Sequence, residues 1–299
     1  MKRINKILVL LAVCAGVLSC EDINVRETEQ YIKQVYIVGA ADVAWNFDVP
    51  YASDPQPVYI SVATGGTQPI DEEVTVTLRH NDTSLNWYNN KYLFGAPAKC
   101  RRLGDDKFSI PSMNATIKAG EVYARLPFTV STEGLHCDSL YAITFEIESV
   151  SKYEKNEEDS VLIMTLNLMN DYSGVYQLNA GKYLLSLNNV TGQYDESPSG
   201  SLSISRTLKA IDKNGVRFFN EAKAETYSEY VTKEDYFSAI DNFCLRFVKN
   251  ADDTFAIMPW KNFEILDGEC TYGNDKFTFW YDYMGDANAR YRIKGTLTK

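Results

Sequence analysis

The sequence predicts an all-β protein, in which an antiparallel β-sandwich precedes an antiparallel, barrel-like (lipocalin-like) domain. Three observations favour this fold class. Apolar residues recur with a period of two, the period of a strand, in runs rich in Val, Ile, Thr and Tyr. Turn residues separate the runs, as in "TGGTQP" and "LGDDK". No long helical pattern lies between them, and strands at this spacing are typical of sandwiches.

The N-terminus has the organisation of a bacterial lipoprotein signal. Three basic residues precede an apolar stretch at 7–18, which is too short to span a membrane because a spanning helix takes roughly 20 apolar residues. The sequence Val17-Leu18-Ser19-Cys20 resembles a lipobox. We therefore expect a signal peptide at 1–19 and a lipid on Cys20, whose buried acyl chains attach the protein to a membrane. An ordinary cleavable signal with an incidental cysteine is the alternative.

The next segment, 20–33, is polar and charged and predicts a tether. Its first acids, Glu21 and Asp22, resemble the export signal that directs lipoproteins of Bacteroidetes to the outer face of the outer membrane. Strands of a sandwich domain at 34–169 are then predicted by "QVYIVGA", "PVYISVA", "EVTVTLR", "VYARLPFTV", "LYAITFEIESV" and "SVLIMTLNL".

A second domain is predicted at 170–299, because "MNDYSG" ends a strong strand and opens an aromatic-rich pattern. Its strand runs alternate with hairpin signals such as "DKNG" and "YGND", and up-and-down strands of this kind suggest a barrel. The segment 195–201, "DESPSGS", predicts a flexible loop. The segment 231–241, "VTKEDYFSAID", fits a short helix or a long loop equally well.

Charge and cysteine content restrict the partners. The formal net charge is −10, and removal of the signal makes it more negative. An acidic protein repels phosphates, which argues against nucleic acid and leaves neutral sugars or peptides as partners. If each half folds separately, the disulfides are Cys100–Cys137 and Cys244–Cys270, but free thiols fit equally well. No CxxC pair supports a zinc site, and we predict no metal.

The search for catalytic motifs gives no candidate. The chain has two histidines and no GxSxG elbow. Its neighbouring acids, such as Glu146 and Glu148, lie on strand faces or in loops, where solvated charges are the usual interpretation. We therefore predict no catalytic residues, no cofactor and no enzyme activity; a hydrolase with an unrecognised carboxylate pair remains an alternative.

Aromatic residues next to polar ones are the candidate glycan-binding residues, because sugar rings stack on aromatic faces while amides and carboxylates bind hydroxyls. In "KFTFWYDY" the alternation places Thr278, Trp280 and Asp282 on the wetter strand face. The alternative for any single aromatic residue is packing in the core or at its rim. The candidates are Trp280, Asp282, Trp260, Trp87 and Trp45.

Several stretches resemble a known type of protein. "VTVTLRHNDTSLNWYNNKY", "IPSMNATIKAGEV" and "YAITFEIESVS" are similar to the N-terminal module of unknown function of Bacteroidetes surface lipoproteins, which also precedes endo-β-N-acetylglucosaminidases. "NDYSGVYQLNAGKY" and "FTFWYDYMGDANARYRIKGTLTK" resemble the β-rich C-terminal module often paired with it. Tyr88 and Asn89 match a Tyr-Asn of the N-terminal module, which favours a structural role for both.

The resemblance implies an immunoglobulin-like N-terminal sandwich and a place in polysaccharide utilisation. It implies a non-catalytic lipoprotein of the outer membrane, facing the cell exterior, that binds glycan for outer-membrane importer proteins. The alternative is a structural or adhesion subunit that pairs with other surface proteins through sheet edges.

Overall fold

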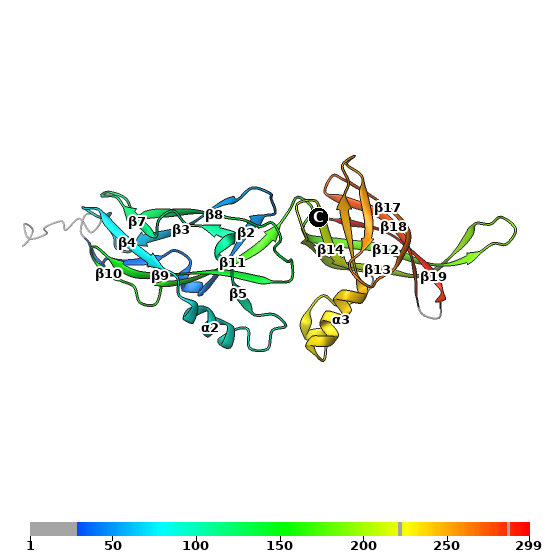
Figure 1. The fold of residues 1–299 in the computed structure, drawn as a ribbon, viewed down its shortest axis with the longest axis horizontal. Coiled ribbons are helices and arrows are strands. Elements are labelled where there is room, and N and C mark those ends of the chain that lie inside the picture. Colours follow the sequence, from blue (N-terminus) through cyan, green and yellow to red (C-terminus); the bar gives the residue numbers. More distant parts are fainter. Residues whose placement is uncertain (1–28, 221–222, 286–287) are drawn as a thin grey trace, which may run out of the picture.

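The computed structural model describes residues 29–220, 223–285 and 288–299. The predicted signal peptide (1–19), Cys20 and most of the tether (20–33) lie outside these residues. Figure 1 shows two β-rich parts arranged end to end along the long axis. The first part contains two sheets and the second a closed barrel.

The N-terminal part is a sandwich of two sheets around one apolar core. The first sheet has the order β10-β1-β3-β8-β6. These strands are Glu154–Lys155, Gln34–Ile37, Gln56–Thr64, Tyr123–Val130 and Phe108–Ser109. The second sheet has the order β2-β11-β9-β4-β7, and β5 also pairs with β9. Its strands are Ala44–Pro50, Val161–Met169, Leu140–Val150, Val74–Arg79, Asn114–Ile117 and Cys100–Arg102.

The predicted immunoglobulin-like sandwich is confirmed, with one correction to its strand directions. Alternate residues of β4, such as Val74, Val76 and Leu78, are buried, as the period-two pattern predicts. The sandwich is not purely antiparallel, because β1–β10, β2–β11 and β5–β9 are parallel pairs. The sequence pattern does not distinguish these directions, since parallel and antiparallel strands share the same side-chain alternation.

The C-terminal part confirms the predicted barrel. Eight antiparallel strands follow one another around it, and the last pairs with the first to close it. The strands are β12 (Gly174–Leu187), β13 (Tyr194–Ala210), β14 (Gly215–Phe219), β15 (Cys244–Lys249), β16 (Phe255–Pro259), β17 (Ile265–Gly273), β18 (Lys276–Met284) and β19 (Arg290–Thr298).

Aromatic side chains line the barrel interior. Phe277, Phe279, Tyr281 and Tyr283 of β18 all point inward and are buried, as their alternation predicts. The turn from β17 to β18 is the predicted "YGND" hairpin. Its central residues, Asn274 and Asp275, have φ angles of 53° and 55°, and positive φ at both positions is the requirement of a type I′ turn.

Two segments have a secondary structure that the sequence did not predict, and the structure shows that a third segment, left open between helix and loop, is a helix. The predicted loop 195–201 lies within β13, whose hairpin with β12 extends beyond the barrel (Figure 1). Helix α2 (Asp82–Lys91) was not expected; it begins where the Asn81 side chain accepts hydrogen bonds from the amides of Thr83 and Ser84. The ambiguous segment 231–241 forms most of helix α3 (Lys233–Phe243), which a Thr232–Asp235 capping box begins.

Candidate functional site

The candidate site lies on the outer face of the barrel, where β18 presents Trp280. Because successive side chains alternate across the sheet, the buried aromatic row of β18 places Thr278, Trp280 and Asp282 outward. Strands β17 and β19 flank β18, so Glu269 and Lys294 lie beside Trp280 in register. A five-strand surface, from β17 through β18, β19 and β12 to β13, therefore surrounds the indole.

The Trp280 ring is held in one orientation. Its Nε1 donates a hydrogen bond of 3.1 Å to Oε2 of Glu269. On the side toward Asp282, the guanidinium of Arg292 lies 4.3 Å from the ring centroid, a cation–π contact. The ring is half-buried. A fixed aromatic ring loses little conformational entropy when a ligand stacks on it, which favours binding.

Asp282 has a different role from the one expected, because its side chain has no exposed surface. Arg292 donates to both of its oxygens, at 2.6 and 2.9 Å, and Arg290 donates twice to Oδ2, at 3.1 and 2.6 Å. Burial opposes ionisation of Asp282, but these hydrogen bonds and charges hold its pKa below the ordinary value. Asp282 therefore orients Arg292 against Trp280; its oxygens are already occupied by arginine donors.

A groove of about 450 Å³ lies against Trp280 on the side away from Asp282. Hydroxyls line it from three strands, namely Thr271, Thr278 and Thr296, together with the amide of Asn179. Glu269 and Lys294 add one charge of each sign. A surface that combines one ordered aromatic ring with several convergent polar groups suits a ligand that has both an apolar face and many hydroxyls.

The groove residues other than Trp280 and Thr278 were not identified from the sequence. Two of them, Lys294 and Thr296, follow the alternation of β19. There Arg292, Lys294 and Thr296 point outward, and Ile293 and Leu297 are buried. Strand pairing brings Lys294 opposite Trp280, and this pairing is a long-range property that a single strand pattern does not contain. The outer face is therefore recognisable only after β17, β18 and β19 are aligned.

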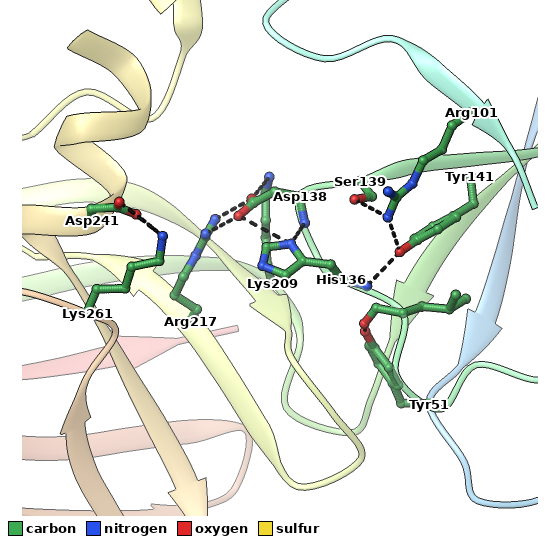
Figure 2. Close-up of polar contacts among 11 residues, drawn as sticks. Tyr51, Arg101, His136, Asp138, Ser139, Tyr141, Lys209, Arg217, Asp241 and Lys261 are labelled. Carbon is green, nitrogen blue, oxygen red and sulfur yellow. Dashed lines mark hydrogen bonds and ion pairs between the residues drawn. The ribbon is translucent and has the colours of Figure 1, made fainter. Parts of the chain in front are cut away.

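Trp260 lies elsewhere, at the junction between the sandwich and the barrel. Its ring covers the guanidinium of Arg217 at 5.1 Å and contacts the ring of His136 at 5.9 Å. Figure 2 shows Arg217 and Lys209 of the barrel converging on Asp138, which belongs to the loop before β9 of the sandwich. These contacts give Trp260 a place in the packing of the junction.

The carboxylate of Asp138 is the centre of this junction. It accepts two hydrogen bonds from Arg217, one of them 2.7 Å long, and one from Lys209 at 3.1 Å. Burial alone would raise the pKa of Asp138, but Arg217 and Lys209 hold it below the ordinary value. The loop that carries Asp138 is fixed from the other side by Tyr141, whose hydroxyl accepts from the His136 amide at 2.9 Å.

The same loop brings three ligand-type side chains together. Atoms of His136, Cys137 and Asp138 lie within 4.8 Å of one another. However, Arg217 and Lys209 already occupy Asp138, and burial raises the pKa of Cys137 to about 11, so that its thiol is protonated near neutral pH. Within the described residues all four cysteines, including Cys100, Cys244 and Cys270, are free thiols.

Trp45 and Trp87 lie on the sandwich, apart from the barrel groove. Trp45, on β2, is 45% exposed and packs its ring directly over Gly39, whose φ of 90° and missing side chain make that contact possible. Trp87, on α2, is 46% exposed and contacts Tyr92 edge-to-face. Of the five predicted residues, the structure thus brings only Trp280 and Asp282 together.

Asn89 of α2 has the structural role that the resemblance implies. Its side chain accepts a hydrogen bond from the amide of Cys100 at 2.8 Å and donates to the carbonyl of Cys100 at 2.7 Å. Tyr88 packs against the small apolar cluster beneath the helix. In the part of the chain that the structure describes, no helix has the length and hydropathy of a membrane span.

Comparisons with known proteins agree with this two-part architecture. One family model, described as an N-terminal domain, matches residues 31–154, and another, described as C-terminal, matches residues 160–298. The search of curated proteins gave no match.

Solved structures from Bacteroides share the fold at low sequence identity. A Bacteroides ovatus multidomain protein that includes a domain of unknown function is 16% identical, with a TM-score of 0.62 over 90% of this chain and 94% of that one. A second Bacteroides ovatus protein, of unknown function, is 14% identical, with a TM-score of 0.62 over 88% and 93%. An auxiliary nutrient binding protein from Bacteroides thetaiotaomicron is 17% identical, with a TM-score of 0.53 over 85% and 89%.

Proposed function

This chain is a two-domain protein of the Bacteroidetes type, and on that premise we propose that it binds a neutral glycan, without catalysing a reaction, in the groove beside Trp280. The observation that carries the proposal is the ordered indole at the edge of a groove lined by three threonine hydroxyls and an amide. One face of the ring is covered by Arg292, and the groove is lined by Thr271 and Thr296, which are in register with Thr278 toward the other end of β18 from Asp282. The nutrient-binding description of a structural neighbour supports a role of this class.

The charges around Trp280 favour a neutral ligand. Arg290 and Arg292 are paired with Asp282, and Lys294 is paired with Glu196 at 2.6 Å. Glu269 is engaged by the indole nitrogen. Since cations and carboxylates balance within this face, it presents no excess charge to attract an anionic polymer.

The proposed location of the protein is the outer membrane, facing the cell exterior, with Cys20 as the lipid attachment point. Support comes from the lipobox-like sequence and the two acids that follow it. A lipid anchor would place the barrel where extracellular glycans, and importer proteins of the outer membrane, are accessible. Mass spectrometry of the mature N-terminus tests this; an N-terminus without acyl chains would refute it.

Binding is tested with the chain from residue 21 onward against a panel of neutral and acidic polysaccharides in affinity electrophoresis. We expect retardation by at least one neutral glycan and none by the acidic ones. Replacement of Trp280 by Ala is expected to abolish the retardation. Trp87→Ala is the matched control, since it removes an equally large aromatic side chain from the sandwich. The proposal would be refuted if no glycan, at millimolar sugar concentration, changed the migration of the wild-type protein.

A second function is favoured by a different surface, the aromatic patch of Trp87, Tyr92 and Phe94 at the end of α2. These side chains are 46%, 50% and 83% exposed, Trp87 contacts Tyr92, and Phe94 follows two residues later. Neighbouring exposed apolar groups often mark contacts with other proteins. The structural or adhesion role would use this patch. It predicts that Phe94→Ser together with Tyr92→Ser reduces the proteins cross-linked to this chain on cells, while Trp280→Ala does not.

A further inference from the structure

The barrel contains an apolar cavity next to a buried amide group. The cavity has a volume of about 110 Å³ and is lined mainly by apolar side chains, with Gly181, Lys182, Gly200 and Ser201 at one edge. Asn220, which follows β14, also lines it, is 2% exposed, and its Oδ1 has no hydrogen-bond partner among the described residues. The apolar lining comprises Leu178, Ala180, Leu202, Phe218, Phe279, Tyr281 and Ile293.

The cavity arises from the way β13 and β14 pair. They share only two residue pairs, Lys209 with Arg217 and Ala210 with Val216. Leu202 of β13 and Phe218 of β14 both line the cavity, and neither belongs to these pairs. Where β13 and β14 are no longer paired, a space is left between their side chains. We call this part of the barrel wall the seam, and the cavity lies there.

Asn220 is held so that its amide group stays in the cavity wall. Its backbone amide donates to the carbonyl of Phe243 at 2.9 Å, which fixes the chain at the end of β14. A buried polar atom without a partner is costly, and most such atoms in proteins are satisfied by protein, water or ligand. An unsatisfied acceptor in a mainly apolar wall therefore identifies the missing partner as a hydrogen-bond donor.

We propose that this cavity is a second binding site, for a compact, neutral, mainly apolar molecule that carries one hydroxyl group donating to Oδ1 of Asn220. An apolar cavity of about 150 Å³ accepts benzene, so a cavity of about 110 Å³ is limited to a single small ring or a short branched chain. The apolar part of the wall disfavours a sugar with many hydroxyls, because hydroxyls placed against it would be buried without partners. The site is thus distinct in chemistry from the outer groove beside Trp280.

The test uses phenol and toluene, which have nearly the same shape and differ in one hydroxyl group. Both are titrated into the two-domain protein while methyl signals of Leu178 and Ile293 are followed by NMR. We expect both sets of signals to shift with phenol, with an affinity at least fivefold higher than for toluene. Water as the only occupant would leave the signals unchanged with either compound, and this result would overturn the proposal.

Two variants test separately the hydrogen bond to Asn220 and the volume of the cavity. Asn220→Leu is expected to remove the preference for phenol over toluene. Leu202→Phe places a larger side chain in the cavity and is expected to lower the affinity for both compounds at least fivefold. Trp280→Ala should change neither affinity, because its side chain lies on the outer face. An unchanged phenol preference in Asn220→Leu, or unchanged binding in Leu202→Phe with a folded NMR spectrum, contradicts the proposal. Each variant reports on a different part of the site, so loss of fold in one leaves the other informative.

Discussion

Asp282 is the residue on which the geometry of the proposed glycan site depends. Its carboxylate holds Arg290 and Arg292, and Arg292 in turn covers one face of Trp280. Asp282→Asn leaves two arginines facing a neutral amide. Because both arginines keep about a fifth of their surface in water, we expect a loss of about 2–3 kcal/mol of unfolding free energy, below the range for fully buried pairs. Urea denaturation at pH 7 measures it, with exposed Asp195→Asn as the control that should change little.

The same carboxylate predicts a dependence of stability on pH. Hydrogen bonds from the two arginines outweigh burial and keep the pKa of Asp282 below its ordinary value in the folded protein. A lowered pKa contributes stability above the unfolded-state value of about 3.9 and loses it as the pH falls through the folded-state value. The stability difference between wild type and Asp282→Asn should therefore shrink between pH 5 and pH 2. A difference that stays constant over this range would contradict the assigned role.

At the residue scale, alternation predicted that Trp280 points outward, and the structure places it on that outer face. The same alternation correctly placed Asp282 on that face but gave no sign of its burial. The burial depends on Arg290 and Arg292, which come from the neighbouring strand β19. Outward direction follows from local sequence, whereas solvent exposure depends on what neighbouring strands contribute.

At the element scale, helix α2 is secured to the sandwich by Asn89, which satisfies both backbone groups of Cys100. Asn89→Ala leaves a buried amide and carbonyl without partners, so we expect a loss of about 2–3 kcal/mol of unfolding free energy. Asn90→Ala is the matched control, because Asn90 is exposed and makes only a 3.5 Å contact with Lys99. Equal stability of the two variants in chemical denaturation would exclude this role.

Helix α3 offers a second test at this scale. The Thr232 side chain accepts from the Asp235 amide, and the Asp235 carboxylate accepts from the Thr232 amide, so each residue satisfies a free donor of the first turn. Thr232→Ala should cost about 1 kcal/mol of unfolding free energy. Thr226→Ala provides a comparison outside the helix. Equal unfolding temperatures for the two variants would argue against a stabilising role of the Thr232 cap.

The elements that the sequence did not predict have a common cause. Helix α2 is short, contains three asparagines and a fourth as its N-cap, and carries its apolar contacts on Leu85 and Tyr88, so no helical periodicity is visible. The segment 195–201 contains turn-forming residues but is held as strand by pairing with β12, including the register shift at Lys182 and Tyr183. In both places tertiary contacts decide the conformation that local composition leaves open.

At the scale of the whole molecule, Asp138 connects the sandwich to the barrel. Arg217 is 2% exposed and binds Asp138 through two hydrogen bonds. Asp138→Ala leaves this guanidinium without its counter-charge, and we expect a wider distribution of interdomain distances because the junction loses its central ion pair. Small-angle X-ray scattering measures this as an increased maximum dimension. Asp171→Ala, at an exposed residue of the connector between the two parts, should leave the scattering curve unchanged.

The arrangement of the two parts was beyond what the sequence predicts. The fold class of each part follows from strand periodicity and turn residues, which are local. The junction pairs Asp138 with Arg217, residues 79 positions apart that belong to no common motif. Similarly, the outer groove requires residues from β12, β17, β18 and β19 to be aligned before its polar lining is apparent.

Isothermal titration calorimetry with the neutral glycan that the panel selects measures the central claim most directly. Wild type, Trp280→Phe, Trp280→Ala and Trp87→Ala are compared at one glycan concentration range. We expect Trp280→Ala to lose tenfold or more in affinity, about 1.4 kcal/mol, Trp280→Phe to keep part of it, and Trp87→Ala to bind as wild type. Wild-type affinity in Trp280→Ala would show that the glycan does not bind in the outer groove.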